Sequence, residues 1–160
     1  MADTETINTP EGAEAAESWD PAAANAWEEA LIADLRANGG RPSGGPLAGN
    51  PLLLLFSKGA KSGRQRRSIL TYTRDGDDYV VAGSKSGAPT HPAWFFNLQA
   101  DPNVTLEVAN ETFPATAKVE QGAERDRLWA NHVGQLPGFG EYPAMTGCRV
   151  IPMIRLSRKR

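Results

Sequence analysis

A run of ten residues, KGAKSGRQRR at 58–67, holds five basic side chains and no acidic one, although the whole chain has a formal net charge of −2. Gly59 and Gly63 would let backbone N–H groups approach an anion closely. Lys61 would add a point charge, and Arg66 would add a planar fork that can bind two oxygen atoms at once. These residue types and their spacing indicate a cradle for phosphate or a similar anion.

Three other interpretations of this run have to be weighed. A P-loop is excluded, because that motif needs glycine at the positions that Leu55 and Ala60 occupy. A nucleic-acid surface fits poorly, since five basic residues do not make a basic domain and the rest of the chain is acidic. A solvated basic turn stays open, because composition alone does not separate it from an anion site.

Other common catalytic chemistries find little support in the sequence. His91 and His132 are far apart and no cluster of possible ligands has metal spacing, so we expect no metal. No serine has the surroundings of a catalytic nucleophile. We expect His91 to have a capping or structural role and His132 to belong to a packed helix face. Cys148 cannot form an internal disulfide, and we expect a buried, inert thiol. An enzyme built in this way would need a cofactor for its chemistry.

Composition places these residues in a single globular domain. The chain has 160 residues, of which 40% are hydrophobic and 22% charged. The longest strongly apolar run, 52–56, is too short to span a bilayer, and the first residues do not resemble a secretory signal. A single cysteine is typical of a reducing compartment, so we expect a cytoplasmic protein with no stable membrane anchor.

Apolar periodicity and turn residues predict the elements that would position the basic run. We expect a disordered acidic leader at 1–17, a helix within 18–40 that Asp20 caps, and a Gly/Pro linker after it. Two further helices are expected at 90–102, with Thr90 as its cap, and at 122–136. Strands are expected at 52–56, 68–73, 79–84, 104–108, 112–120 and 148–156.

The order of these elements predicts the fold class. Most strands follow one another through short turns, which favours an antiparallel barrel with helices packed outside it, a mainly β fold with helices (α+β). Pro114 and Pro152 suggest that their strands lie at sheet edges or bulges, because proline cannot donate to a strand ladder. The expected domain organisation is a leader at 1–17, a helix at 18–40 and a barrel domain at 41–160.

From about Pro51 onward the chain resembles the deazaflavin-dependent nitroreductase family. These proteins are F420-dependent reductases on a split β-barrel related to the FMN-binding split barrel. The resemblance covers roughly two-thirds of the chain, and its order and intervals are more specific than any one segment. It rests on LLLLFSKGAKSGRQRR, DGDDYVVAGSKSGAPTHPAWFFNL, ADPNVTLEV, ERDRLWANHV, PGFGEY and RVIPMIRL.

The resemblance implies that the anion is coenzyme F420, a deazaflavin joined through a phospholactyl linker to several glutamates. Lys61, Ser62 and Arg66 would bind the phosphate, and the charges of Lys58 and Arg64 suit the glutamate tail. The full set of implied cofactor contacts is Ala60, Lys61, Ser62, Arg66, Arg67, Ser68, Ile69, Leu70, Ala82, Gly83, Ser84, Lys85, Ala93, Trp94, Phe95, Asn97 and Phe139.

The activity that the resemblance implies is hydride transfer from reduced F420 to an activated alkene or enone, a quinone or a nitro compound. Ser84 and Tyr142 are the candidate catalytic residues, as hydrogen-bond donors to the oxygen that gains charge. The quinone-reducing members have several tyrosines in the segment LPGFGEYPAMT, whereas this chain has Tyr142 alone, with Leu136 and Phe139 instead of hydroxyls. A less polar site is compatible with an apolar enone, an alkene or a dehydro-amino acid.

Other functions of the same fold stay open at this point. The small number of catalytic groups is compatible with a non-catalytic F420-binding or carrier protein, and FMN or haem occupies the barrel in related folds. The expected partner is a small-molecule substrate and not nucleic acid. A homodimer is compatible with the fold, because split barrels often pair through an exposed sheet.

Overall fold

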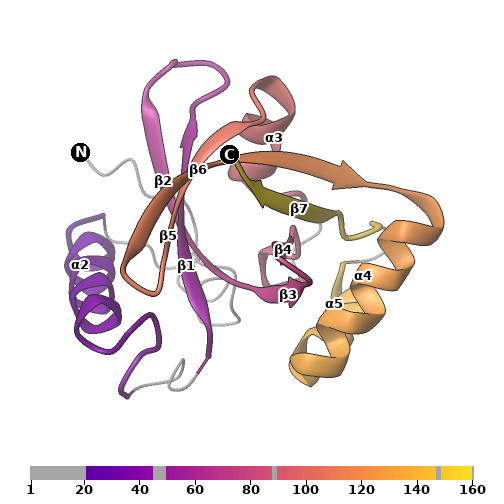
Figure 1. Cartoon of the computed structure of the whole chain (residues 1–160), viewed down its shortest axis with the longest axis horizontal. Coiled ribbons are helices and arrows are strands. Elements are labelled where there is room, and N and C mark those ends of the chain that lie inside the picture. The colour runs from indigo at the N-terminus through magenta and orange to yellow at the C-terminus, as the bar shows by residue number, and fades with distance from the viewer. Residues whose placement is uncertain (1–20, 45–49, 88–89, 147–148, 160) are drawn as a thin grey trace.

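The computed structural model describes residues 21–44, 50–87, 90–146 and 149–159 of the chain (Figure 1). The expected acidic leader at 1–17, the Asp20 cap and Cys148 lie outside the described residues. The helix expected within 18–40 is present as α2 (Pro21–Ala37), with a proline as its first described residue. Gly39 and Gly40 follow it with positive φ angles, and the Gly40 N–H donates to the Leu35 carbonyl, which closes the helix end.

Strand β1 (Leu52–Lys58) is buried on both of its faces, which explains its unbroken apolar sequence. Leu52 and Leu54 pack with Ile32 and Leu35 of α2. Leu53 and Leu55 belong instead to the largest core cluster, on the opposite face of the sheet. The apolar face of α2 therefore covers one side of β1, and the interior of the curled sheet lies on the other.

All seven strands belong to one antiparallel sheet in the order β2-β1-β5-β6-β7-β4-β3. The two strands at its ends, β2 and β3, are consecutive in the chain with Tyr72 alone between them. The sheet must therefore curl until its ends meet, and the expected barrel-like α+β fold is confirmed. The remaining strands are β2 (Gln65–Thr71), β3 (Thr73–Asp75), β4 (Asp78–Ala82), β5 (Asn103–Val108), β6 (Glu111–Glu120) and β7 (Met153–Arg158).

Helices cover the curled sheet at opposite sides, with α2 beside β1 and β5 and α4 beside β3 and β7 (Figure 1). Helix α3 (Ala93–Ala100) begins at Pro92 with no side-chain cap, so the expected Thr90 cap is wrong. Helix α4 (Gly122–Gln135) matches its prediction. The segment after α4 forms two short helical pieces, η2 (Pro137–Glu141) and α5 (Tyr142–Met145), while η1 (Lys85–Gly87) follows β4.

Strands β6 and β7 lie inside the sheet, so the edge strands that the two prolines suggested are not observed, although each proline lies just outside the β6–β7 ladder. The ladder between β6 and β7 ends at Ala115, so the missing N–H of Pro114 falls just beyond the last pair, where its carbonyl still accepts from the Lys159 N–H at 3.0 Å. Pro152 comes one residue before β7, and its carbonyl accepts from the Gly83 N–H. At neither position does the sheet need a backbone N–H donor, which proline lacks.

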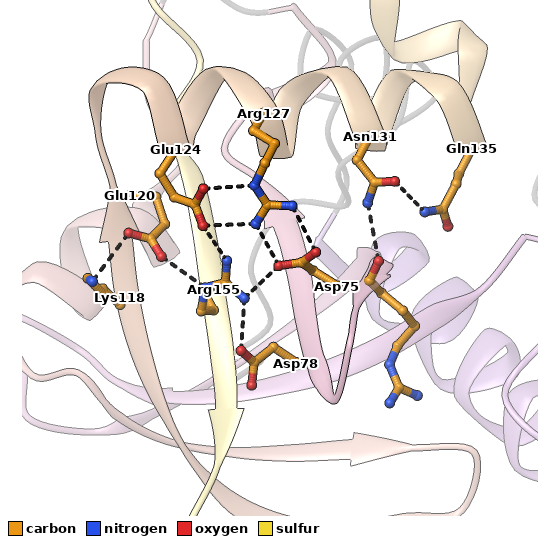
Figure 2. A network of polar contacts seen from close by, with 10 residues as sticks. Asp75, Asp78, Lys118, Glu120, Glu124, Arg127, Asn131, Gln135 and Arg155 are labelled. Carbon is orange, nitrogen blue, oxygen red and sulfur yellow. Dashed lines mark hydrogen bonds and ion pairs between the residues drawn. The ribbon is translucent and has the colours of Figure 1, made fainter.

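A network of ion pairs joins α4 to the sheet (Figure 2). Arg155 of β7 lies at its centre, between carboxylates from the β3–β4 hairpin, the end of β6 and α4. Arg127 of α4 donates to Asp75 and to Glu124 and completes the network. In the part of the chain that the structure describes, no helix has the length and apolar character needed to cross a membrane.

His132 of α4 is fully buried, as the sequence predicts for a packed helix face. Its Nδ1 lies 2.9 Å from the Thr73 hydroxyl oxygen, its ring packs edge-on against Phe139, and its Nε2 has no hydrogen-bond partner among the described residues. Burial lowers the pKa of His132 to about 4, because a charged imidazole would lose its hydration there. The neutral ring is therefore the form that the fold accommodates.

This pKa predicts a loss of stability in acid. Because the unfolded histidine has a pKa of about 6.5, the unfolded state binds more protons between pH 6.5 and pH 4, and stability falls as the pH falls through this range. Between pH 7 and pH 5 we expect the free energy of unfolding attributable to His132 to fall by about 2 kcal/mol. Urea unfolding of the protein and of His132→Phe at both pH values measures it. Equal pH slopes in the two proteins would contradict the prediction.

Candidate active site

The basic run forms a tight loop between β1 and β2, held by its own backbone. The Gly59 N–H donates to the Arg64 carbonyl at 2.7 Å, and the Gly63 N–H donates to the Gly59 carbonyl at 2.9 Å. The Ser62 hydroxyl accepts from the Arg64 N–H at 3.1 Å. Lys61 and Ser62 are exposed at the tip of this loop, so the loop has a defined shape while its cation can reach a ligand.

A side chain at position 59 would crowd the base of this loop. A Cβ atom on Gly59 would lie 2.6 Å from the Ser62 hydroxyl oxygen and 3.2 Å from the Arg64 carbonyl oxygen. The loop is also tied to α3, because the Ala60 N–H donates to the buried Asn97 side-chain oxygen at 2.9 Å. The basic loop and helix α3 thus meet at one end of the barrel (Figure 1).

The strands beside the loop divide the predicted cofactor residues between two faces of the sheet. Arg66 and Ser68 lie on the same face as Leu70, which belongs to the interior core, and their register partners on β1 are Ser57 and Leu55. The side chains of Arg67 and Ile69 lie on the opposite face, against α2. Arg67 pairs there with Glu29 at 3.4 Å, and Ile69 packs in the α2 cluster.

The interior face carries polar groups that fit an oxygen-rich ligand. The hydroxyls of Ser57 and Ser68 are buried and have no hydrogen-bond partner among the described residues. Buried polar atoms are normally paired, so two unpaired hydroxyls next to a half-buried arginine are an exception that a ligand would explain. Arg66, Ser57 and Ser68 together offer the donors that a phosphate-bearing polar cofactor needs.

The second group of predicted residues lies where β4 ends. Ala82 and Ser84 are fully buried, the Gly83 N–H donates to the Pro152 carbonyl at 2.8 Å, and Lys85 has a positive φ of 48°. This turn leads into η1, which packs against α5. A Cβ atom on Gly87 would lie 2.8 Å from the Met145 Cβ atom, so the contact between the two segments is close.

Phe139 and Tyr142 lie on the same side of β4 as Ala82. All three belong to one buried cluster together with Leu128 and Met153, and the Phe139 and Tyr142 rings meet edge-on with centroids 5.1 Å apart. The predicted catalytic pair, Ser84 and Tyr142, therefore comes from two segments that pack together through η1 and α5.

The predicted residues of α3 line the barrel interior to different extents. Trp94 and Phe95 are buried in the main core cluster with Leu70, whereas Ala93 is exposed. Asn97 is buried and holds the basic loop. Trp94 and Phe95 thus contribute to the core, their contact with the cofactor stays a prediction, and the polar contact of this helix comes from Asn97.

Two residues that the sequence did not single out as site residues connect these groups. The guanidinium group of Arg149 donates to the carbonyls of Gly83 and Ser84 at 2.8 and 2.7 Å and to the His91 Nδ1 at 2.7 Å. The His91 ring packs against Phe95 of α3, with centroids 4.9 Å apart. No spacing rule relates Arg149 to position 83 or 91, so only the folded chain reveals this connection.

Comparison with known proteins is consistent with this geometry. A family model of F420H2-dependent quinone reductases matches residues 28–157. An F420H2-dependent quinone reductase of Mycobacterium tuberculosis is 39% identical over 115 residues, which are 68% of this chain and 74% of the relative. The solved structure of an F420-H2 dependent reductase (FDR-A) is 34% identical with a TM-score of 0.62, and it covers 67% of this chain and 94% of its own.

A further solved structure, described as a domain-swapped dimer, is 29% identical with a TM-score of 0.63 and covers 86% of this chain and 100% of its own. The family model alone covers most of the chain, and the curated relative exceeds 30% identity over two-thirds of it. The expected split-barrel resemblance, oxidoreductase class and F420 dependence are therefore confirmed. The chain belongs to the F420H2-dependent quinone reductase family, a family of oxidoreductases whose cofactor is coenzyme F420.

Proposed function

We propose that this protein transfers a hydride from reduced coenzyme F420 to a small organic acceptor with a conjugated carbonyl group, either an enone or a quinone. The observation that carries the proposal is the basic loop at 59–64, which is docked on α3 and continues into an interior face with Arg66 and two unpaired hydroxyls. A polyanionic, phosphate-bearing cofactor matches this donor set better than a neutral ligand does.

Different residues of the basic run would bind different parts of the cofactor. Arg66, half-buried and on the interior face, would hold the phosphate together with Lys61 and Ser62 at the loop tip. Lys58 and Arg64 are exposed, so they could follow a flexible glutamate tail at the surface. Held in this way, the cofactor would be oriented by one charged end, and its ring would extend toward the turn at Gly83 and Ser84.

Reduced F420 supplies the hydride when it is bound, so the chain has to bind, orient and stabilise charge. We assign Ser84 the role of hydrogen-bond donor to the acceptor oxygen, because its buried position shields that bond from water. Tyr142 would supply a second hydroxyl from the packed α5 segment, with its ring supported by Phe139. Both roles belong to the proposal.

The segment beside the ring favours an apolar acceptor. Leu136 and Phe139 pack in the same cluster as Tyr142, so one hydroxyl stands among apolar groups in the segment 136–142. An apolar surface with a single donor suits a planar conjugated carbonyl compound, which has an oxygen at one end and an apolar body. A nitro compound spreads its developing charge over two oxygens and would find fewer donors here.

Turnover with a panel of acceptors tests the proposed function. We expect the purified protein to oxidise F420H2 in the presence of cyclic enones or a short-chain quinone, and more slowly with nitroarenes, as followed by the cofactor absorbance. Mixtures that lack the acceptor or the protein are the controls. Binding of F420 without oxidation by any acceptor would favour a carrier protein and would contradict the proposed activity.

Assembly and location complete the proposal. We infer that the chain forms a homodimer, for which the domain-swapped dimer among the similar structures is the support. The single cysteine supports a reducing location such as the cytosol.

A further inference from the structure

Arg149 makes an unusual set of contacts for a residue that is not among the expected site residues. It is partly buried, and its guanidinium group donates to the carbonyls of two consecutive residues, Gly83 and Ser84, and to the ring of His91. Each of these distances is 2.8 Å or less. A planar guanidinium can hold several acceptors in one fixed arrangement, which a lysine ammonium cannot do equally well.

The contact with His91 also fixes the state of that histidine. An arginine side chain can only donate, so the His91 Nδ1 has to be the acceptor and its proton has to be on Nε2. Burial and the nearby positive charge of Arg149 lower the pKa of His91, which keeps the ring neutral. The ring in turn packs against Phe95 and lies 5.9 Å from the half-exposed Phe96, measured between centroids.

Arg149 therefore connects the two halves of the site. On one side it holds the turn at 83–84, which comes directly before Lys85 with its positive φ. On the other side it reaches α3 through His91, and α3 binds the basic loop through Asn97 and Ala60. The described contacts form a continuous path from the phosphate loop to the turn that we assign to the cofactor ring.

We propose that Arg149 is a positioning residue of the reductase, which holds the Gly83–Ser84 turn and His91 in the one arrangement that places the cofactor ring. The inference rests on the proposed function, because it assumes that the turn flanks the ring. Arg149 itself would act through the two carbonyls and His91 and not on the reacting atoms. Its removal should leave the phosphate loop intact but let the turn adopt several conformations.

The test compares Arg149→Met with Arg125→Met. Arg125 is a matched control, because it is also partly buried and donates twice to the Ile151 carbonyl, at 3.1 and 2.8 Å, so it braces the same chain segment without contact to the turn. We expect Arg149→Met to raise the dissociation constant of F420 about tenfold in a fluorescence titration. We also expect a lower kcat at saturating F420H2. Arg125→Met should match the wild type in both.

Nitrogen NMR of the histidine rings provides a readout without cofactor. The chain has two histidines, and His132 serves as the internal reference. In the wild type we expect the proton of His91 on Nε2, and in Arg149→Met a mixture of tautomers. If Arg149→Met does not fold, Arg149→Lys tests the positioning role in its place. We expect it to raise the F420 dissociation constant about threefold, because one of the three hydrogen bonds can persist.

The possible outcomes separate this inference from the proposed function. Failure of the wild-type protein to bind F420 would overturn the proposed function and this inference with it. Normal binding by the wild type and equal values for Arg149→Met and Arg125→Met would overturn the positioning role alone. A changed His91 tautomer with unchanged F420 binding and kcat would also overturn it, because the contact would then be structural.

Discussion

Arg66→Ala will raise the dissociation constant of F420 about 30-fold, whereas Arg64→Ala will raise it less than about threefold. Arg66 lies on the interior face of the β1–β2 ladder, beside Ser57 and next to the unpaired Ser68 hydroxyl, and it is half-buried. A charge-assisted hydrogen bond in such surroundings is worth about 2 kcal/mol, which corresponds to the larger of the two effects.

Arg64 is a suitable control because its backbone makes two hydrogen bonds that shape the loop. Its carbonyl accepts from the Gly59 N–H and its N–H donates to the Ser62 hydroxyl, and both contacts survive truncation to alanine. Its exposed side chain would lose only a screened attraction for the glutamate tail. The Arg64→Ala effect should therefore shrink as salt is raised, while the Arg66→Ala effect should persist.

Fluorescence titration of F420 into both variants at low and at physiological salt measures these effects. Circular dichroism at the same temperature checks that both variants are folded. Equal losses of affinity in the two variants would contradict the assignment of Arg66 to the phosphate. That result would favour a diffuse basic surface, which is the solvated-turn interpretation of the run.

The sequence predicts the elements well where one local signal decides the structure. The continuous apolar run at 52–56 predicts a strand that is buried on both faces, and β1 has that pattern. The Ala109-Asn110 turn predicts the second hairpin, and both residues have the positive φ angles that a tight hairpin turn needs. The basic run predicts the loop that the structure places against Asn97.

The errors arise where distant parts of the chain decide the structure. The segment 68–73 reads as one strand, but the chain crosses from one end of the sheet to the other at Tyr72. Pro114 reads as an edge residue, but β7 ends next to it and removes the need for its donor. Arg149 begins the segment RVIPMIRL, but the sequence does not indicate its contacts, because its partners are about 60 positions away and two of them are backbone carbonyls.

The ion-pair network around Arg155 predicts a large effect on stability. Arg155 bonds Asp75 and Asp78 at 2.8 Å, and Glu120 and Glu124 at 2.9 Å. Its own side chain is 14% exposed and that of Glu120 is 8% exposed, so Arg155→Met would leave a mostly buried carboxylate with only the exposed Lys118, at 3.4 Å, as its cation. We expect a loss of about 2 to 3 kcal/mol and a fall in Tm of about 5 to 10 °C.

Arg158→Met on the same strand is the control. Arg158 forms an ion pair with Glu111 in which both side chains are about half exposed, so water can replace the lost partner. Its guanidinium also lies over the Phe113 ring, which a methionine side chain can still cover, so Tm should change little. Calorimetry of both variants at one pH and one salt concentration compares them. Similar falls in Tm would show that the network acts as a set of ordinary surface pairs and not as a unit.

The location of the loss matters as much as its size. Because Arg155 joins β7 to Asp75 of the β3–β4 hairpin and to Glu124 of α4, its removal should release α4 first (Figure 2). Hydrogen exchange in Arg155→Met should therefore accelerate over 122–135, while β1 and its partner β2, which carry none of the four carboxylates that Arg155 binds, keep wild-type protection. Uniform acceleration in all strands would instead mean that the network stabilises the whole sheet and not the attachment of this helix.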